Sequence, residues 1–202
     1  METLIKAIEV FALVTGLAYI VLEILQKDAM WWVGIATGAA CAFSFAVQRL
    51  YASMGLNIYY VAVSVWGIVQ WRRDRKALQA EGCGEDALHL RKPSRRTLWL
   101  SGGVLVAGTL LLSLLLQRLG DSASALDAGV TVLSAIATWW LAKSYPEQWL
   151  LWIVADLLST VLCVRAGMNW MAVLYFAYAV SAAYGWLYWK KKGKYIEQHA
   201  DL

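Results

Sequence analysis

Three side chains in the last third of the sequence, Trp149, Trp152 and Asp156, have types and spacing suited to ligand binding. Separations of three and four residues place them on one face of a helix. A carboxylate inside an apolar span costs at least about 2.5 kcal/mol unless it is paired or hydrated, and indole faces attract cations. The pattern predicts a cavity wall for a cationic or polar solute. In the alternative, the tryptophans are interface anchors and Asp156 bonds a neighbouring helix.

Two further stripes of polar and aromatic residues recur at helical spacing. Steps of three and four residues connect Asn57, Tyr60, Ser64, Gly67 and Trp71, and the same steps connect Tyr175, Tyr178, Ala182, Gly185 and Trp189. On two helices these stripes would face each other across a central pore, and Gly67 and Gly185 would permit close packing or a hinge-like motion. The alternative is a packed bundle in which the polar side chains bond between helices.

The composition shows which solvent surrounds these elements. Hydrophobic residues make up 60% of the 202 residues and charged residues 16%, whereas an average soluble domain is about 45–50% apolar and about 25% charged. The mean hydropathy is +0.54, and the 12 Trp and 10 Tyr are typical of membrane-interface belts. Most of the chain therefore lies in a lipid bilayer.

Seven apolar runs are long enough to approach the thickness of the hydrocarbon core. They lie near Leu4–Leu25, Met30–Val47, Tyr51–Trp71, Leu98–Leu116, Leu126–Leu141, Trp149–Val164 and Asn169–Trp189. The runs lack proline and period-2 alternation, so we expect helices rather than barrel strands. The spacing of Gly34 and Gly38 indicates a close helix contact, either within the protomer or in an oligomer.

The basic residues orient these spans. Fourteen of the 18 Lys and Arg fall in segments that seven spans place on one side of the membrane. The positive-inside rule then puts the N-terminus outside and the C-terminus in the cytoplasm. The net charge of +4 needs no nucleic-acid partner, because the basic loop has no aromatic residues among its cations.

A shift of 118 residues aligns Trp31 with Trp149, Gly67 with Gly185, and Trp71 with Trp189. We therefore predict an all-α membrane protein with seven transmembrane helices in a 3+1+3 parallel repeat. Its parts are a first three-helix repeat (1–71), a basic cytoplasmic loop (72–97), a linker transmembrane helix (98–116), a second three-helix repeat (125–189) and a basic cytoplasmic tail (190–202). Parallel repeats that enclose a solute site are a recurrent transporter plan.

Several chemistries lack the residues that they need. The two histidines, His89 and His199, fall in the polar loop and tail, and no Ser-His-Asp, HExxH or Walker pattern occurs. We expect no metal, no cofactor and no enzymatic activity. A seven-helix membrane sensor remains an alternative of another class, and it would need a signalling partner.

Three segments resemble the PnuC-type (Pnu) vitamin transporters. They are the stretch from Leu50 to Trp71, the run from Glu147 to Ile153, which resembles that family's E-N-W-L-L-W signature, and the stretch from Leu174 to Trp189. The resemblance implies a full-length SWEET-like fold, a homo-oligomer that is a trimer, and location in the bacterial inner membrane. It also implies facilitated uptake of an unphosphorylated vitamin, usually nicotinamide riboside, which a cytoplasmic kinase then traps.

Four positions depart from the family pattern. Nicotinamide riboside transporters carry Gln where this chain has Asn57, and Asn where it has Ser64, Asp156 and Tyr184. The resemblance implies that these positions contact the amide and ribose of the substrate. Because nicotinamide riboside and thiamine both contain a cationic heteroaromatic ring, an aromatic cage with Asp156 suits either. We expect nicotinamide riboside first, with thiamine or riboflavin as alternatives.

Overall fold

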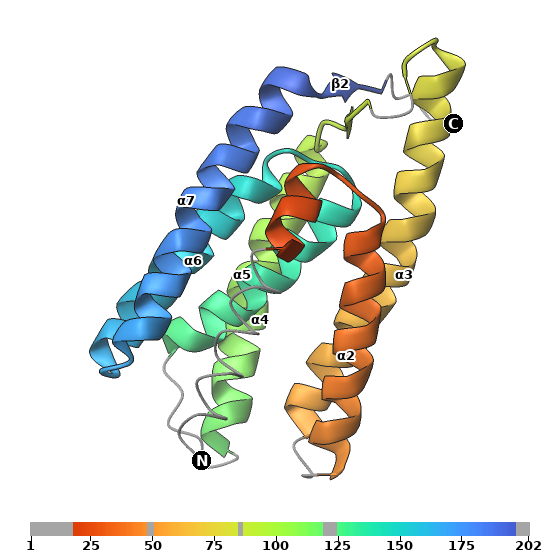
Figure 1. Ribbon diagram of the computed structural model, residues 1–202. Coiled ribbons are helices and arrows are strands. Elements are labelled where there is room, and N and C mark those ends of the chain that lie inside the picture. The colour runs from red at the N-terminus through yellow and green to blue at the C-terminus, as the bar shows by residue number, and fades with distance from the viewer. Residues whose placement is uncertain (1–17, 48–50, 85–86, 119–124, 197–202) are drawn as a thin grey trace, which may run out of the picture.

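A computed structural model describes residues 18–47, 51–84, 87–118 and 125–196, and it confirms the all-α class (Figure 1). Residues 18–24 are the described end of the first helix, and most of the expected span from Leu4 lies outside the described residues. The other elements are α2 (Ala29–Val47), α3 (Tyr51–Ala80), β1 (His89–Leu90), α4 (Arg95–Arg118), α5 (Ala125–Ala142), α6 (Gln148–Arg165), α7 (Asn169–Lys192) and β2 (Lys194–Tyr195).

The helices form two antiparallel pairs, α2 with α3 and α6 with α7, and α5 packs against α3, α4 and α6. α2 and α6 both follow tight turns at the same end of the bundle. Gln26 and Ser144, 118 residues apart, have positive φ angles of 52° and 58° in these turns. Left-handed backbone is uncommon for residues other than glycine, so its recurrence at this spacing is a specific match between the two halves.

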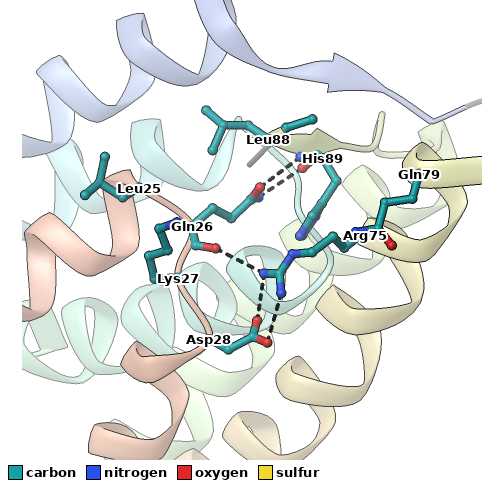
Figure 2. A pocket seen from close by; sticks show the side chains of 9 residues that line it. Leu25, Gln26, Lys27, Asp28, Arg75, Gln79, Leu88 and His89 are labelled. Carbon is teal, nitrogen blue, oxygen red and sulfur yellow. Dashed lines mark hydrogen bonds and ion pairs between the residues drawn. The ribbon is translucent and has the colours of Figure 1, made fainter. Parts of the chain in front are cut away.

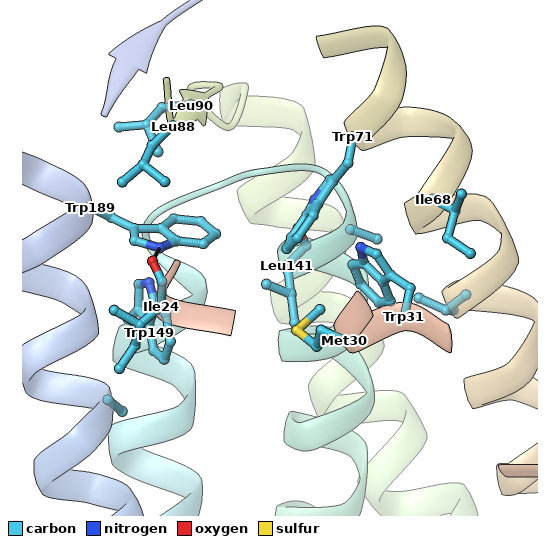
Figure 3. Close-up of a cluster of buried hydrophobic side chains, with 13 residues drawn as sticks. Ile24, Met30, Trp31, Ile68, Trp71, Leu88, Leu90, Leu141, Trp149 and Trp189 are labelled. Carbon is cyan, nitrogen blue, oxygen red and sulfur yellow. Dashed lines mark hydrogen bonds between the residues drawn. The ribbon is translucent and has the colours of Figure 1, made fainter. Parts of the chain in front are cut away.

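The tryptophans at the core repeat the same geometry (Figure 3). Ring centroids are 5.0 Å apart for Trp31 and Trp71, and 5.5 Å apart for Trp149 and Trp189, with near-perpendicular planes in both pairs. Edge-to-face packing of this kind is favourable because the ring edge is positive and the face negative. Trp71 Nε1 donates to the Leu141 carbonyl at 3.1 Å. The corresponding bond joins the two halves in the opposite sense. Trp189 Nε1, in the second half, donates to the Ile24 carbonyl of the first half at 2.9 Å.

The ends of the central helices differ from the boundaries expected from hydropathy. α3 continues past Trp71 to Ala80, and α4 begins at Arg95, so much of segment 72–97 is helical. The extension of α3 buries Leu78 and Asp74 against the connection to α4. In that connection, β1 pairs in parallel with β2 of the tail, with His89 opposite Lys194. The tail therefore folds back onto the loop.

We call the end of the bundle that holds these segments the basic end. Its Lys and Arg residues are Lys27, Arg72, Arg73, Arg75, Lys76, Arg91, Lys92, Arg95, Arg96, Lys143, Lys190, Lys191, Lys192 and Lys194.

Four of the described helices, α4 to α7, are long and apolar enough to cross a membrane, and α2 contains a shorter apolar stretch, Ala29–Phe43. α4 is the least buried of the four. Its large apolar side chains, among them Trp99, Leu110 and Leu111, are exposed. Such a surface is stable in contact with lipid but not with water.

Candidate functional site

A cavity of about 210 Å³ lies among the first helix, α6 and α7. Its lining residues are Tyr19, Ile20, Glu23, Trp149, Trp152, Asp156, Tyr178 and Ala182. The three α6 residues come from the helix face that the sequence pattern identified, and Tyr178 comes from the α7 stripe. The structure therefore brings four of the expected binding residues to one cavity.

Two carboxyl groups face this cavity. Asp156 is 8% exposed and Glu23 is 5% exposed. The Gln148 side-chain amide donates to Glu23 Oε1 at 3.3 Å. Within the described ranges no side chain donates a hydrogen bond to the Asp156 carboxyl group. A buried carboxylate without a partner is costly, so the cavity favours a solute that brings a positive charge or hydrogen-bond donors.

The aromatic side of the cavity also has unused hydrogen-bonding capacity. The indole N–H groups of Trp149 and Trp152 are buried and have no partner among the described residues. An unsatisfied buried donor costs about 1–3 kcal/mol. Hydroxyl or carbonyl oxygens of a solute would satisfy both donors, while the ring faces would contact an aromatic group.

The remaining expected residues lie around the cavity or away from it. Tyr175 packs edge to face on Tyr178, with ring centroids 6.2 Å apart, while Asn57 and Tyr60 are half-buried on α3 and do not line the cavity. Ser64 is buried against Gly34, whose Cβ position would lie 3.0 Å from Ser64 Oγ. Tyr184 is 59% exposed and stacks on Tyr188. The structure thus does not bring Tyr184 to this cavity, because it lies on the outer face of α7.

The two halves of the molecule differ where the cavity forms. Positions 118 residues before Trp152 and Asp156 are Gly34 and Gly38. A Cβ on Gly38 would lie 2.8 Å from a Val61 methyl group, so α2 packs directly on α3. The Gly-x-x-x-Gly spacing is therefore a close contact within the protomer. At the matching positions of α6, large and charged side chains line a cavity instead.

Sequence reasoning missed Glu23 and Tyr19 as lining residues. Glu23 carried a usable signal, because an ionisable residue inside an apolar run is rarely there without a function. Its partner could not be read from the sequence, since Gln148 is 125 positions away.

Comparison with known proteins identifies the family of this chain. A family model described as "Nicotinamide mononucleotide transporter" matches residues 6–191. The chain belongs to this transporter family.

Its relatives include the nicotinamide riboside transporter PnuC of Neisseria mucosa, which is 28% identical over 89% of this chain and 70% of the relative. The PnuC protein of Escherichia coli K12 is 26% identical over 90% of this chain and 84% of its own length. A crystal structure of the vitamin B3 transporter PnuC superposes with a TM-score of 0.60 at 26% identity, covering 90% of this chain and 81% of that one. The chain is thus a multi-pass membrane transporter, not an enzyme.

The transporter has a second polar cluster at its basic end (Figure 2). Gln26 exchanges two hydrogen bonds of 2.9 Å with the backbone of His89. His89 Nδ1 lies 2.9 Å from Ser144 Oγ, and Ser144 Oγ donates to Asp74 at 3.3 Å. Arg91 also donates to Asp74, at 2.7 Å. The loop before α4 is therefore bonded to both positive-φ turns.

A pocket of about 390 Å³ lies beside this cluster. Its charged groups are occupied by one another, since Arg75 Nη2 and Asp28 Oδ1 are 2.9 Å apart. The cluster therefore holds the two turns together rather than presenting a free binding group.

Acid is expected to destabilise the protein through His89. Burial, and secondarily the positive charges of Arg75 and Arg91, lower the pKa of His89 to about 3. In the unfolded chain the imidazole has a pKa of about 6.5, so below that pH the unfolded state binds a proton that the folded state does not. Stability is present above pH ~6.5 and falls toward pH 3, with a loss of about 2 kcal/mol at pH 5.

Thermal unfolding in detergent from pH 7.5 to 5 would measure this slope in the wild type and in His89→Asn. Asparagine can still donate to Ser144 but does not titrate, so its curve should be flatter by that amount. Parallel curves for the two proteins would contradict the assignment.

Proposed function

We propose that this protein carries nicotinamide riboside across the bacterial inner membrane by facilitated diffusion. The observation that carries the proposal is the cavity that combines Asp156 and Glu23 with Trp149 and Trp152. A pyridinium ring is both cationic and aromatic, so it gains from carboxylates and indole faces together. Each cation–π contact contributes about 0.5–2 kcal/mol. The names of the relatives point to the same substrate.

The polar groups of the substrate have partners at the same site. In the proposed complex, the indole N–H groups of Trp149 and Trp152 donate to ribose or amide oxygens, and Asp156 accepts from ribose hydroxyls. Tyr178 and Tyr175 complete the aromatic wall around the substrate ring. We propose that Asn57, Tyr60 and Ser64 of the α3 stripe contact the substrate on its way to the cavity.

The size of the cavity bears on mechanism. Its volume of about 210 Å³ is below the roughly 300–1,000 Å³ of typical small-molecule sites. A nucleoside would therefore need the helices to separate before it binds. We propose that two parallel three-helix units, joined by α4 in a 3+1+3 repeat, rock against each other in alternating access. The positive-φ turns and indole pairs that recur 118 residues apart support this arrangement.

The direction of net uptake follows from chemistry inside the cell. Facilitated diffusion only equilibrates its substrate, so phosphorylation by a cytoplasmic kinase would trap the nucleoside. We place the basic end and the C-terminus in the cytoplasm, and the N-terminus outside, because basic residues accumulate on the cytoplasmic side. We also propose a homotrimer.

Titration of the purified protein with nicotinamide riboside, thiamine and riboflavin, followed by tryptophan fluorescence, tests the assignment. We expect saturable quenching with nicotinamide riboside at the lowest concentration. Tighter binding of thiamine would reassign the substrate within the vitamins, and binding of none by folded protein would remove the assignment.

The same titration tests the location of the site. Trp152→Ala should weaken binding by more than 1 kcal/mol, or about fivefold. The control is Trp170→Ala, because Trp170 is 88% exposed and lies away from the cavity. Equal effects of the two substitutions would place the site elsewhere.

A further inference from the structure

An apolar groove of about 440 Å³ opens on the outside of the bundle, away from the solute cavity. α5 forms its floor, with Val132, Ala135 and Trp139 among the lining residues, while α3 and α4 form its walls. α3 and α4 each pack on α5. The groove therefore lies between α3 and α4, which both pack on α5 but leave a gap between each other.

The groove has little to offer a polar solute. Its polar side chains are already engaged, since the Tyr59 hydroxyl donates to the Ala135 carbonyl at 2.7 Å and the Ser101 hydroxyl accepts from Trp140 Nε1 at 3.0 Å. Thr131 donates to the Asp127 carbonyl at 3.0 Å. The remaining lining is hydrocarbon and the Trp139 ring. The part of an occupant that enters the groove is therefore expected to be apolar.

The dimensions of the groove match one leaflet of a bilayer. Its lining runs from Leu100 to Leu112 on α4 and from Thr131 to Trp139 on α5. At 1.5 Å per residue these spans are about 18 Å and about 12 Å, compared with roughly 15 Å for half of the hydrocarbon core. The groove is therefore long enough to hold one acyl chain within one leaflet.

A positive charge lies beside Trp139, the lining residue closest to the C-terminal end of α5. Lys143, at the end of α5, places its ammonium 5.3 Å from the ring centroids of both Trp139 and Trp66. No carboxylate among the described residues forms an ion pair with Lys143. Lys190 makes a similar contact over Trp186 but has Glu147 at 4.0 Å. The exposed Arg95 and Arg96 begin α4, which is one wall of the groove.

We propose that this groove binds an anionic glycerophospholipid, with one acyl chain along α5 and its phosphate beside Lys143. Burial of the chain supplies affinity at about 0.8 kcal/mol per CH₂ group. The uncompensated ammonium supplies the preference for an acidic headgroup. The lipid would fix α4 against α5 and α3, and this role is independent of the vitamin that the protein transports.

Native mass spectrometry of the delipidated full-length protein, titrated with phosphatidylglycerol or phosphatidylcholine, tests the proposal. We expect the wild type to retain phosphatidylglycerol at least fivefold better. Lys143→Gln should remove that preference, whereas Lys190→Gln should keep it. Equal retention of both lipids by the wild type would overturn the proposal.

The groove itself is tested by filling it. Val104→Trp places a large ring in the α4 wall and should lower retention of both lipids at least fivefold, while Val106→Trp, on the exposed face of the same helix, should not. Equal effects would overturn the proposal. A change of oligomeric state in Val104→Trp with lipid retention intact would identify the groove as a subunit contact instead.

A third measurement uses only the wild type, so it does not depend on whether a variant folds. Phosphatidylglycerol with a mid-chain diazirine should label peptides of the groove floor several-fold more than the outer face of α7. Uniform labelling would contradict a specific site.

Discussion

Replacing Asp156 with leucine is expected to weaken binding of nicotinamide riboside about 30-fold or more. Asp156 is buried beside the cavity, and its carboxyl group accepts no hydrogen bond from the other described side chains. The substrate would therefore be its main partner. Hydrogen bonds to charged groups contribute about 1.5–3 kcal/mol, and 2 kcal/mol corresponds to roughly 30-fold. Leucine has the same branched arrangement of heavy atoms but offers neither charge nor acceptor.

Asp156→Asn separates charge from hydrogen bonding. The amide can still accept from a ribose hydroxyl, and the Glu23 carboxyl group still lines the same cavity. We expect a loss of less than about fivefold, which is under 1 kcal/mol. Both variants would be measured by fluorescence titration, with thermal unfolding to check that they fold. Wild-type affinity in Asp156→Leu would show that the cavity does not bind the substrate.

The sequence predicted the helices of the bundle well. Apolar runs indicated the helices. The 118-residue spacing aligned Trp31 with Trp149 and Trp71 with Trp189, and the structure places Trp31 against Trp71 and Trp149 against Trp189. These features are readable because they depend on local hydropathy and on large side chains at regular spacing.

The helix ends were less predictable, because hydropathy shows which residues lie in lipid or in water but not where the helical backbone ends. Segment 72–80 is rich in Arg, Lys, Ala and Leu, all good helix formers. α3 therefore continues beyond the apolar run to Ala80, shortly before Gly82, whose φ is +81°. The pairing of β1 with β2 involves two residues on each strand and leaves no periodicity to detect.

The site was predicted in part for a similar reason. Spacing along α6 and α7 identified Trp149, Trp152, Asp156 and Tyr178, since helical geometry fixes which residues share a face. Spacing does not show how a helix is rotated in the bundle, and Tyr184 consequently lies outward. Contacts between distant elements, such as Glu23 with Gln148, depend on tertiary packing alone.

Alanine at Gly185 and alanine at Gly67 are expected to cost similar stability but to differ in their effect on binding. A Cβ on Gly185 would lie 2.7 Å from Trp149 Cζ2, and a Cβ on Gly67 would lie 2.7 Å from Trp31 Cζ2. Both rings are buried and each packs against a second indole, so an added Cβ forces the ring or the helix backbone to shift. Overpacking of this kind costs about 1–3 kcal/mol.

The difference arises because Trp149 lines the solute cavity and Trp31 does not. A displaced Trp149 ring should lower nicotinamide riboside affinity at least fivefold in Gly185→Ala, whereas Gly67→Ala should bind within twofold of wild type. Gly102→Ala is the control, since nothing lies within 4 Å of its Cβ position. Thermal unfolding and fluorescence titration of the three proteins give both quantities. Equal losses of affinity in Gly67→Ala and Gly185→Ala would mean that the two halves contribute alike to binding. The substrate site would then not be determined by the presence of Trp152 and Asp156 on α6 where α2 has Gly34 and Gly38.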